Sequence, residues 1–189
     1  MIQSHIRLIL IVIFLASSHA KAALLDLNLF YISDSLTTAT TASYGKTFYA
    51  LCAALNIDHK GSYLVGWNYA TYSSSEAVGS ATTTYTSTQM GPKFLVFLNK
   101  DHNWLLGLAY NILTSANDQA GSAPAEIWRG TAYSADFGYH QMVSESLMLG
   151  LRLNYSTSSY SEKLIGTAYS TISYSRTFIY PSMAISFIF

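Results

Sequence analysis

The chain has 189 residues, ten acidic and ten basic side chains, and only 11% charged residues, well below the roughly 25% of an ordinary soluble domain. The balanced charge excludes a basic face for nucleic acid, and the single cysteine, Cys52, excludes an internal disulfide framework. Hydrophobic residues reach 50% of the chain, with 15 Tyr and 9 Phe.

The first 22 residues have the pattern of an export signal. His5 and Arg7 lie in a short polar start, residues 8–16 are apolar, and 20–22 read Ala-Lys-Ala, which fits a small-x-small cleavage rule. The apolar run is shorter than the ~20 residues of a spanning helix, so an uncleaved anchor is the weaker interpretation. We predict a mature chain starting at Ala23. Removing Arg7 and Lys21 leaves eight basic residues against ten acidic ones, a net charge of −2.

The mature chain contains eight segments in which apolar residues alternate with small or polar ones, as in strands whose two faces meet different surroundings. The predicted strands are 25–33, 47–57, 62–72, 89–98, 104–114, 127–140, 145–155 and 171–189. Short turns are predicted at 58–61, 99–103 and 141–144, and long polar loops at about 34–43, 73–88, 117–126 and 156–170. Pro92 removes a ladder donor, so we expect it near the start of its strand.

The last strand is the most informative segment. Its outward series is wholly apolar, and its second series is mostly small or polar. The outward series is Phe189, Phe187, Ile185, Met183 and Pro181, and the second is Ile188, Ser186, Ala184, Ser182 and Tyr180.

An alternating final strand that ends in Phe resembles the closing strand of bacterial outer-membrane β-barrels. The whole mature chain is similar in architecture to the small OmpA/OmpX-type barrels, and no particular member matches. The resemblance implies an all-β, eight-stranded, antiparallel up-and-down transmembrane barrel spanning 23–189. It implies an assembly signal read by the barrel-assembly machinery, for which the candidates are Tyr180, Phe187 and Phe189.

Three regularities agree with this architecture. Short and long connections alternate, as periplasmic turns and external loops do, which would place both termini in the periplasm. Mid-strand glycines fall on the inward phase, where a narrow lumen needs room. Charges fall there too, and the expected lumenal network is Asp26, Lys93, Asp136, Arg152 and Arg176.

Outward aromatic residues gather at the strand ends, as expected for girdles at two membrane interfaces. On the turn side they are Tyr63, Trp104, Tyr139 and Phe189; on the loop side they are Tyr31, Tyr69, Tyr110, Tyr133 and Tyr155. The alternative is a soluble lipocalin-type barrel with the apolar face inside. That arrangement would require rows of Leu and Trp in a small interior, and it would not explain the girdles.

Catalysis has few candidates in this sequence. His140, Ser144 and Glu145 are close in sequence, but spacing across a turn is not the geometry of a triad. No histidines, cysteines or acids converge by spacing on a metal, and no cofactor is expected. Cys52 is expected to be a small lumenal filler.

We therefore predict a non-enzymatic, monomeric integral protein of the bacterial outer membrane, in contact with membrane lipid and lipopolysaccharide. Its lumen would be filled by side chains, and its loops would serve envelope structure or adhesion. Two alternatives remain open: a narrow channel for small or apolar solutes, in which the inward charges line an ion path, and a lipid-modifying enzyme.

Overall fold

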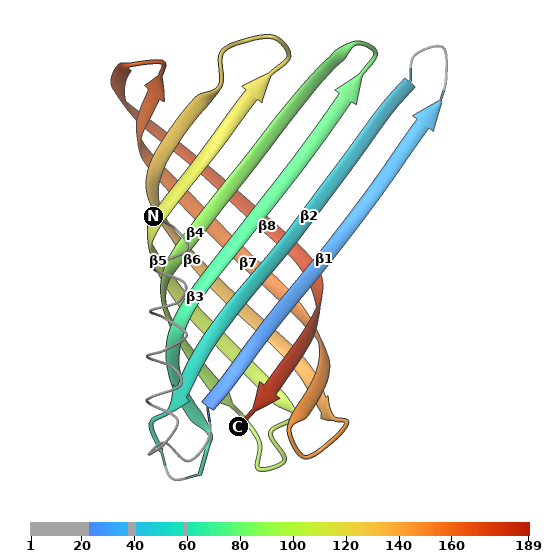
Figure 1. Cartoon of the computed structure of the whole chain (residues 1–189), viewed down its shortest axis with the longest axis vertical. Helices are drawn as coiled ribbons and strands as arrows, with labels where there is room; N and C mark the ends of the chain where they lie inside the picture. Colours follow the sequence, from blue (N-terminus) through green and yellow to red (C-terminus); the bar gives the residue numbers. More distant parts are fainter. Residues whose placement is uncertain (1–22, 38–40, 59) are drawn as a thin grey trace.

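The computed structural model describes residues 23–37, 41–58 and 60–189, which form one closed, antiparallel, up-and-down barrel in the order β1 to β8 (Figure 1). The expected export signal at 1–22 and His59 lie outside the described residues. The strands are β1 (Ala23–Thr37), β2 (Thr41–Asn56), β3 (Tyr63–Val78), β4 (Ala81–Phe97), β5 (Trp104–Ala120), β6 (Glu126–Met142), β7 (Leu147–Ile165) and β8 (Ala168–Ile188). Among these residues, no helix is long and apolar enough to cross a membrane.

The strands are longer than the sequence indicated, because most of the expected long loops are strand. β3 and β4 pair out to Val78 and Ala81, and β7 and β8 pair out to Ile165 and Ala168. The tips are tight turns at which Gly79, Gly121 and Gly166 adopt positive φ. The Ser- and Thr-rich segments thus form hairpins that project beyond the apolar part of the barrel, and the prediction of long loops was wrong there.

The short connections lie where they were predicted. Residues 57–63 and 98–104 are closed by backbone hydrogen bonds from Ile57 to Tyr63 and from Leu98 to Trp104. The side chain of Asp58 accepts a bond from the Tyr63 amide at 3.0 Å, which holds the pKa of this exposed carboxyl below its usual value. We call this the short-turn end of the barrel and the opposite end the hairpin end.

The register shifts at four places in the barrel, none of which was foreseen, and two of them affect β4 and β5. Pro92 lies well inside β4, not near its start, and the register with β5 shifts between Met90 and Lys93. The prediction failed because a bulge lets a strand omit the bond that Pro cannot donate. β5 has a second shift between Asn111 and Thr114, which leaves both Ile112 and Leu113 exposed.

The orientation of the two faces is as predicted. The outward Leu, Ile, Trp and Tyr side chains are exposed, while Asp26, Lys93, Asp136 and Arg152 are at most 5% exposed. A soluble barrel would bury the first group and hydrate the second. Most of the exposed large apolar side chains form a band in the half of the barrel nearer the short-turn end, while Val78, Ile127 and Ile165 are exposed at the hairpin end.

We expect an arginine in this band to destabilise the barrel in a bilayer. Leu151 is 69% exposed, so Leu151→Arg removes little packing but places a charge in hydrocarbon, which costs about 2–4 kcal/mol at mid-depth. Unfolding by urea in lipid vesicles, followed by the heat-modifiable shift on a gel, measures the loss.

Ser159→Arg is the matched control, because Ser159 is exposed on the same strand beyond the band. We expect little change there. Equal stability of the two variants in vesicles would contradict the assignment of the band to lipid.

Candidate functional site

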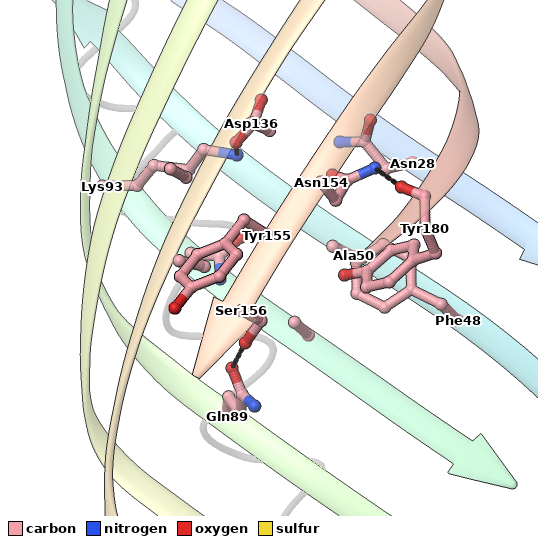
Figure 2. A pocket seen from close by; sticks show the side chains of 14 residues that line it. Asn28, Phe48, Ala50, Gln89, Lys93, Asp136, Asn154, Tyr155, Ser156 and Tyr180 are labelled. Carbon is pink, nitrogen blue, oxygen red and sulfur yellow. Dashed lines mark hydrogen bonds and ion pairs between the residues drawn. The ribbon is translucent and has the colours of Figure 1, made fainter. Parts of the chain in front are cut away.

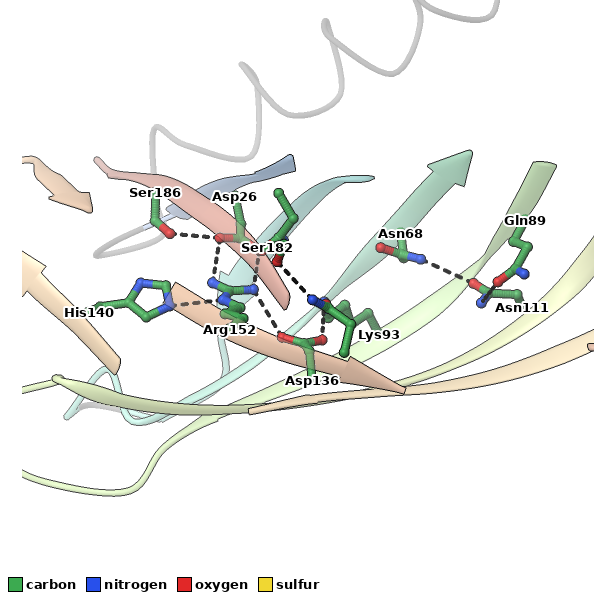
Figure 3. A network of polar contacts seen from close by, with 12 residues as sticks. Asp26, Asn68, Gln89, Lys93, Asn111, Asp136, His140, Arg152, Ser182 and Ser186 are labelled. Carbon is green, nitrogen blue, oxygen red and sulfur yellow. Dashed lines mark hydrogen bonds and ion pairs between the residues drawn. The ribbon is translucent and has the colours of Figure 1, made fainter. Parts of the chain in front are cut away.

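The lumen near the short-turn end contains a closed network of two acids and two bases (Figure 3). Arg152 on β7 grips Asp26 on β1 with both terminal nitrogens, with N–O distances of 2.7 and 2.6 Å. Its Nη1 also lies 3.0 Å from Asp136 on β6, and Asp136 pairs with Lys93 on β4 at 2.6 Å. The formal charges cancel, as buried ions require.

Neutral groups complete the network. Asp26 also accepts from Ser186 at 2.6 Å and from Asn28 at 3.0 Å. The Nε of Arg152 donates to Nε2 of His140 at 2.8 Å. His140 is therefore the neutral tautomer that accepts at Nε2. The cluster thus joins strands on opposite sides of the barrel.

Arg176 does not belong to this network, contrary to expectation. Its guanidinium lies 3.6 Å from the ring centroid of Tyr85 and 5.4 Å from that of Phe178, and its Nη2 is 3.5 Å from Ser74 Oγ. It was grouped with the others because it shares their inward phase. However, the alternation of side chains along a strand shows only which face a residue lies on. It does not show how far along the barrel axis the residue lies.

An amide chain lies between the ion network and the hairpin end. Asn68 donates to Asn111 at 3.2 Å, Asn111 donates to Gln89 at 3.1 Å, and Gln89 donates to Ser158 at 3.0 Å. Between the two layers is a cavity of about 20 Å³ with a mixed polar and apolar lining that includes Asn28, Lys93 and Asp136 (Figure 2). This is room for about one water molecule, and the buried Asn28 Oδ1 has no protein partner among the described residues.

On the hairpin side of the amide chain, aromatic side chains fill the lumen. The buried members of this cluster are Phe48, Tyr72, Tyr85, Tyr160, Phe178 and Tyr180. Tyr72 stacks on Phe178 with centroids 3.9 Å apart, and the hydroxyls of Tyr85 and Tyr160 are 2.6 Å apart. The sequence reading missed Tyr85 and Tyr160 because it placed them in polar loops. The period-two spacing of Tyr85, Ser87 and Gln89 was the signal that could have found them.

The predicted girdle residues lie on the outside of the barrel. Near the short-turn end, Trp104 lies against Tyr139 with centroids 5.2 Å apart, and toward the hairpins Tyr110 stacks on Tyr133 at 4.8 Å. The remaining candidates Tyr31, Tyr63, Tyr155 and Phe189 are exposed, and Tyr69 is half-buried. Their role at membrane interfaces stays a prediction.

The three candidates for the assembly signal separate into two positions. Phe187 and Phe189 are on the outer surface, whereas Tyr180 is only 7% exposed and lies in the lumen against Phe48. A factor that approaches from outside could contact the first two directly. Their role as an assembly signal stays a prediction.

The candidate catalytic residues do not assemble into a triad. His140 is fully buried, with Nε2 bonded to Arg152, while Ser144 and Glu145 are exposed in the turn that follows β6. Cys52 is buried in an apolar cluster with Leu24, Leu64 and neighbouring side chains, as expected of a filler. Within the described part of the chain, no group of three His, Cys, Asp or Glu is placed to hold a metal ion.

Two solved structures resemble the chain to different degrees. The crystal structure of Neisserial surface protein A aligns with a TM-score of 0.50 at 14% identity, covering 88% of this chain and 94% of that one. The translocator domain of the autotransporter NalP from Neisseria meningitidis aligns with a TM-score of 0.40 at 9% identity, covering 98% and 69%. No protein-family model matches the sequence. No curated protein matches it at a significant level.

These observations define the class of fold. The chain has the fold of a small outer-membrane β-barrel, with eight strands and a lumen occupied by its own side chains. At 14% identity the likeness concerns the fold alone.

We expect Arg152→Met to destabilise the barrel by about 3–5 kcal/mol, because it leaves the Asp26 carboxylate buried without its cation. Urea unfolding in vesicles measures the change. The double variant Asp26→Asn/Arg152→Met removes the stranded charge and should regain part of that loss. A double variant as unstable as Arg152→Met alone would contradict the charge argument.

A pH-dependent contact is expected at the hairpin end. Glu126 accepts from the Trp128 indole at 3.0 Å and from Lys163 at 3.1 Å, and these bonds hold the pKa of Glu126 below its usual value. The contact should therefore persist at neutral pH and weaken only as the pH falls below the ordinary glutamate range of about 4.3. Tryptophan fluorescence during acid titration follows Trp128.

Glu126→Gln is the control for this titration, because it keeps an acceptor for Trp128 but cannot titrate. The acid-induced change should vanish in that variant. The same change in both proteins would assign it to Trp67 or Trp104 instead.

Proposed function

We propose that the chain is an integral protein of the bacterial outer membrane without an enzymatic activity or an open pore. Its role would be envelope structure or adhesion through the projecting hairpins. The observation that carries the proposal is the inversion of the barrel: a contiguous exposed apolar band surrounds a buried ionic network. Apolar area of this extent on a barrel wall is costly in water and suits acyl chains.

The proposed orientation puts the short turns and both termini in the periplasm. The hairpins then project outward, where their Ser and Thr side chains would meet lipopolysaccharide sugars or another surface. This follows the usual arrangement of such barrels, with short connections inside and long ones outside. The closing residues Phe187 and Phe189 would be available on the wall to the assembly machinery.

A protease-site insertion tests location and orientation together. A cleavable tag after Ser122, at a hairpin tip, should be cut in intact cells, whereas the same tag after Lys100, in a short turn, should be cut only after the outer membrane is opened. The heat-modifiable shift confirms folding in both. Cleavage only at Lys100 in intact cells would reverse the orientation, and recovery of folded protein in the soluble fraction would refute membrane insertion.

The alternative role as a narrow channel is disfavoured by the occupied lumen. The ion network, the amide chain and the aromatic cluster follow one another along it, and the cavity between the first two has room for only about one water molecule. We expect planar bilayers with the purified protein to show no current steps above the background of a lipid-only control. Reproducible steps that scale with protein concentration would establish the channel and contradict the closed lumen.

A further inference from the structure

The barrel wall closes along only part of the seam between β1 and β8. These strands pair from Leu24 with Ile188 to Leu29 with Met183, although β1 continues to Thr37 and β8 begins at Ala168. On its other side, β8 pairs with β7 along nearly its whole length. Figure 1 shows β1 and β8 together near the C-terminus and far apart at the hairpin end.

The hydrogen-bonding pattern of the paired part of β1 and β8 shows which backbone groups face this opening. Ala23 and Phe189 exchange both backbone hydrogen bonds, at 3.1 and 2.9 Å. Because antiparallel strands alternate hydrogen-bonded and non-bonded pairs, odd-numbered residues of both strands point their N–H and C=O across the seam. Beyond the pair of Leu29 and Met183, the residues whose N–H and C=O face the opening are Tyr31, Ser33 and Ser35 on β1, and Pro181, Ile179, Thr177 and Ser175 on β8.

Pro181 is placed where it opposes closure within one chain. The register of the paired segment would put Pro181 opposite Tyr31, in a position where each residue should donate and accept. Pro has no N–H, so this rung loses a bond. Within sheets, Pro is confined to edges and bulges, and β8 behaves as an edge from this point on.

Exposure marks the same opening. The outward side chains that flank it are Tyr31, Ile179 and Met183, at 73%, 68% and 66% exposed. Ile32 has the inward phase and is nevertheless 44% exposed, because the wall beside it lacks a neighbouring strand. Below it, Phe30 and Tyr180 lie 5.9 Å apart between ring centroids and cover the lumen.

Unpaired peptide groups beside apolar side chains need a partner. If the band lies in the membrane, as proposed above, the backbone of Tyr31 and Ile179 meets the upper edge of the hydrocarbon, where exposed edges are strongly disfavoured. In water as well, an unpaired edge is a template for another strand.

We propose that the edges of β1 and β8 beyond Leu29 and Met183 are the docking surface for a second copy of this chain. β1 of each copy would pair antiparallel with β8 of the other. The chain has one edge running in each direction, so two copies related by a two-fold axis complete both edges at once. The flanking outward side chains are uncharged, and a register between copies is free to avoid placing Pro181 opposite Tyr31. This inference rests on the proposed membrane location and differs from the monomer expected from sequence.

Disulfide cross-linking between two tagged copies tests the proposal. In a Cys52→Ala background, Ser33→Cys is placed in one copy and Thr177→Cys in a second copy with another tag, and both are expressed together. After mild oxidation in membranes, we expect a cross-linked dimer that contains both tags, at several times the level of the control. The control replaces Thr177→Cys with Ser115→Cys, which is exposed on β5, three strands away from β8. Ser33→Cys alone should form no dimer, because β1 is not expected to meet β1 of its partner.

Three results would overturn the proposal. One is cross-linking no greater than the control while both proteins are folded, and a second is dimer formation by Ser33→Cys alone. The third is an internal disulfide in a single copy with both Ser33→Cys and Ile179→Cys, which would show that the seam closes on itself. Ser35→Cys with Ser175→Cys serves as a second pair if the first impairs folding.

The same samples separate this inference from the proposed function. Membrane fractionation and the heat-modifiable shift are recorded for each. A folded monomer in the outer membrane overturns only the dimer, whereas folded protein outside the membrane overturns the proposed function.

Discussion

The ion pairs of Arg152 with two carboxylates are the interactions on which the packing of the barrel interior depends. Asp26 and Asp136 come from β1 and β6, and Arg152 reaches both from β7. Three ionised groups in so small a volume are tolerable only because Lys93 balances the charge and neutral donors satisfy the remaining oxygens. Losing any one member leaves a buried net charge that is not compensated, so the network acts as a unit that fixes how the strands face one another.

The network also explains why glycine occupies certain positions on the inner face of the barrel. A Cβ at Gly107 would meet the Asp136 carboxylate, and one at Gly138 would lie 2.5 Å from Cγ of Arg152. An eight-stranded barrel is just wide enough for its own side chains. Gly107 and Gly138 thus make room for Asp136 and Arg152 on the neighbouring strands. A Cβ at Gly66, Gly91 or Gly130 would instead meet backbone atoms of the next strand.

Much of this could be predicted from the sequence, because alternation along a strand assigns each residue to a face. The apolar series of β7 and the inward phase of Arg152 follow from period two alone, and so does the burial of Cys52. Height along the lumen does not follow, since it depends on the strand registers. Arg176 was therefore grouped with Asp26, although it stacks on Tyr85 much nearer the hairpin end. The polar hairpins were read as loops because Ser and Thr alternation has no hydrophobic contrast, and the bulge that accommodates Pro92 leaves no local signal.

The contrast between the two ends of the barrel suggests a division of roles within one sheet. Near the short turns, β1 and β8 are paired, and the ion network crosses the lumen directly behind that seam. Toward the hairpins the cross-lumen contacts become aromatic and the β1–β8 ladder stops. Aromatic packing tolerates an open wall better than buried ions do, because water reaching an ion pair weakens it while stacked rings keep most of their buried area. The seam can thus open at the aromatic level without exposing Arg152, which leaves the outer part of β1 and β8 free to contact another molecule while the inner part keeps the barrel closed.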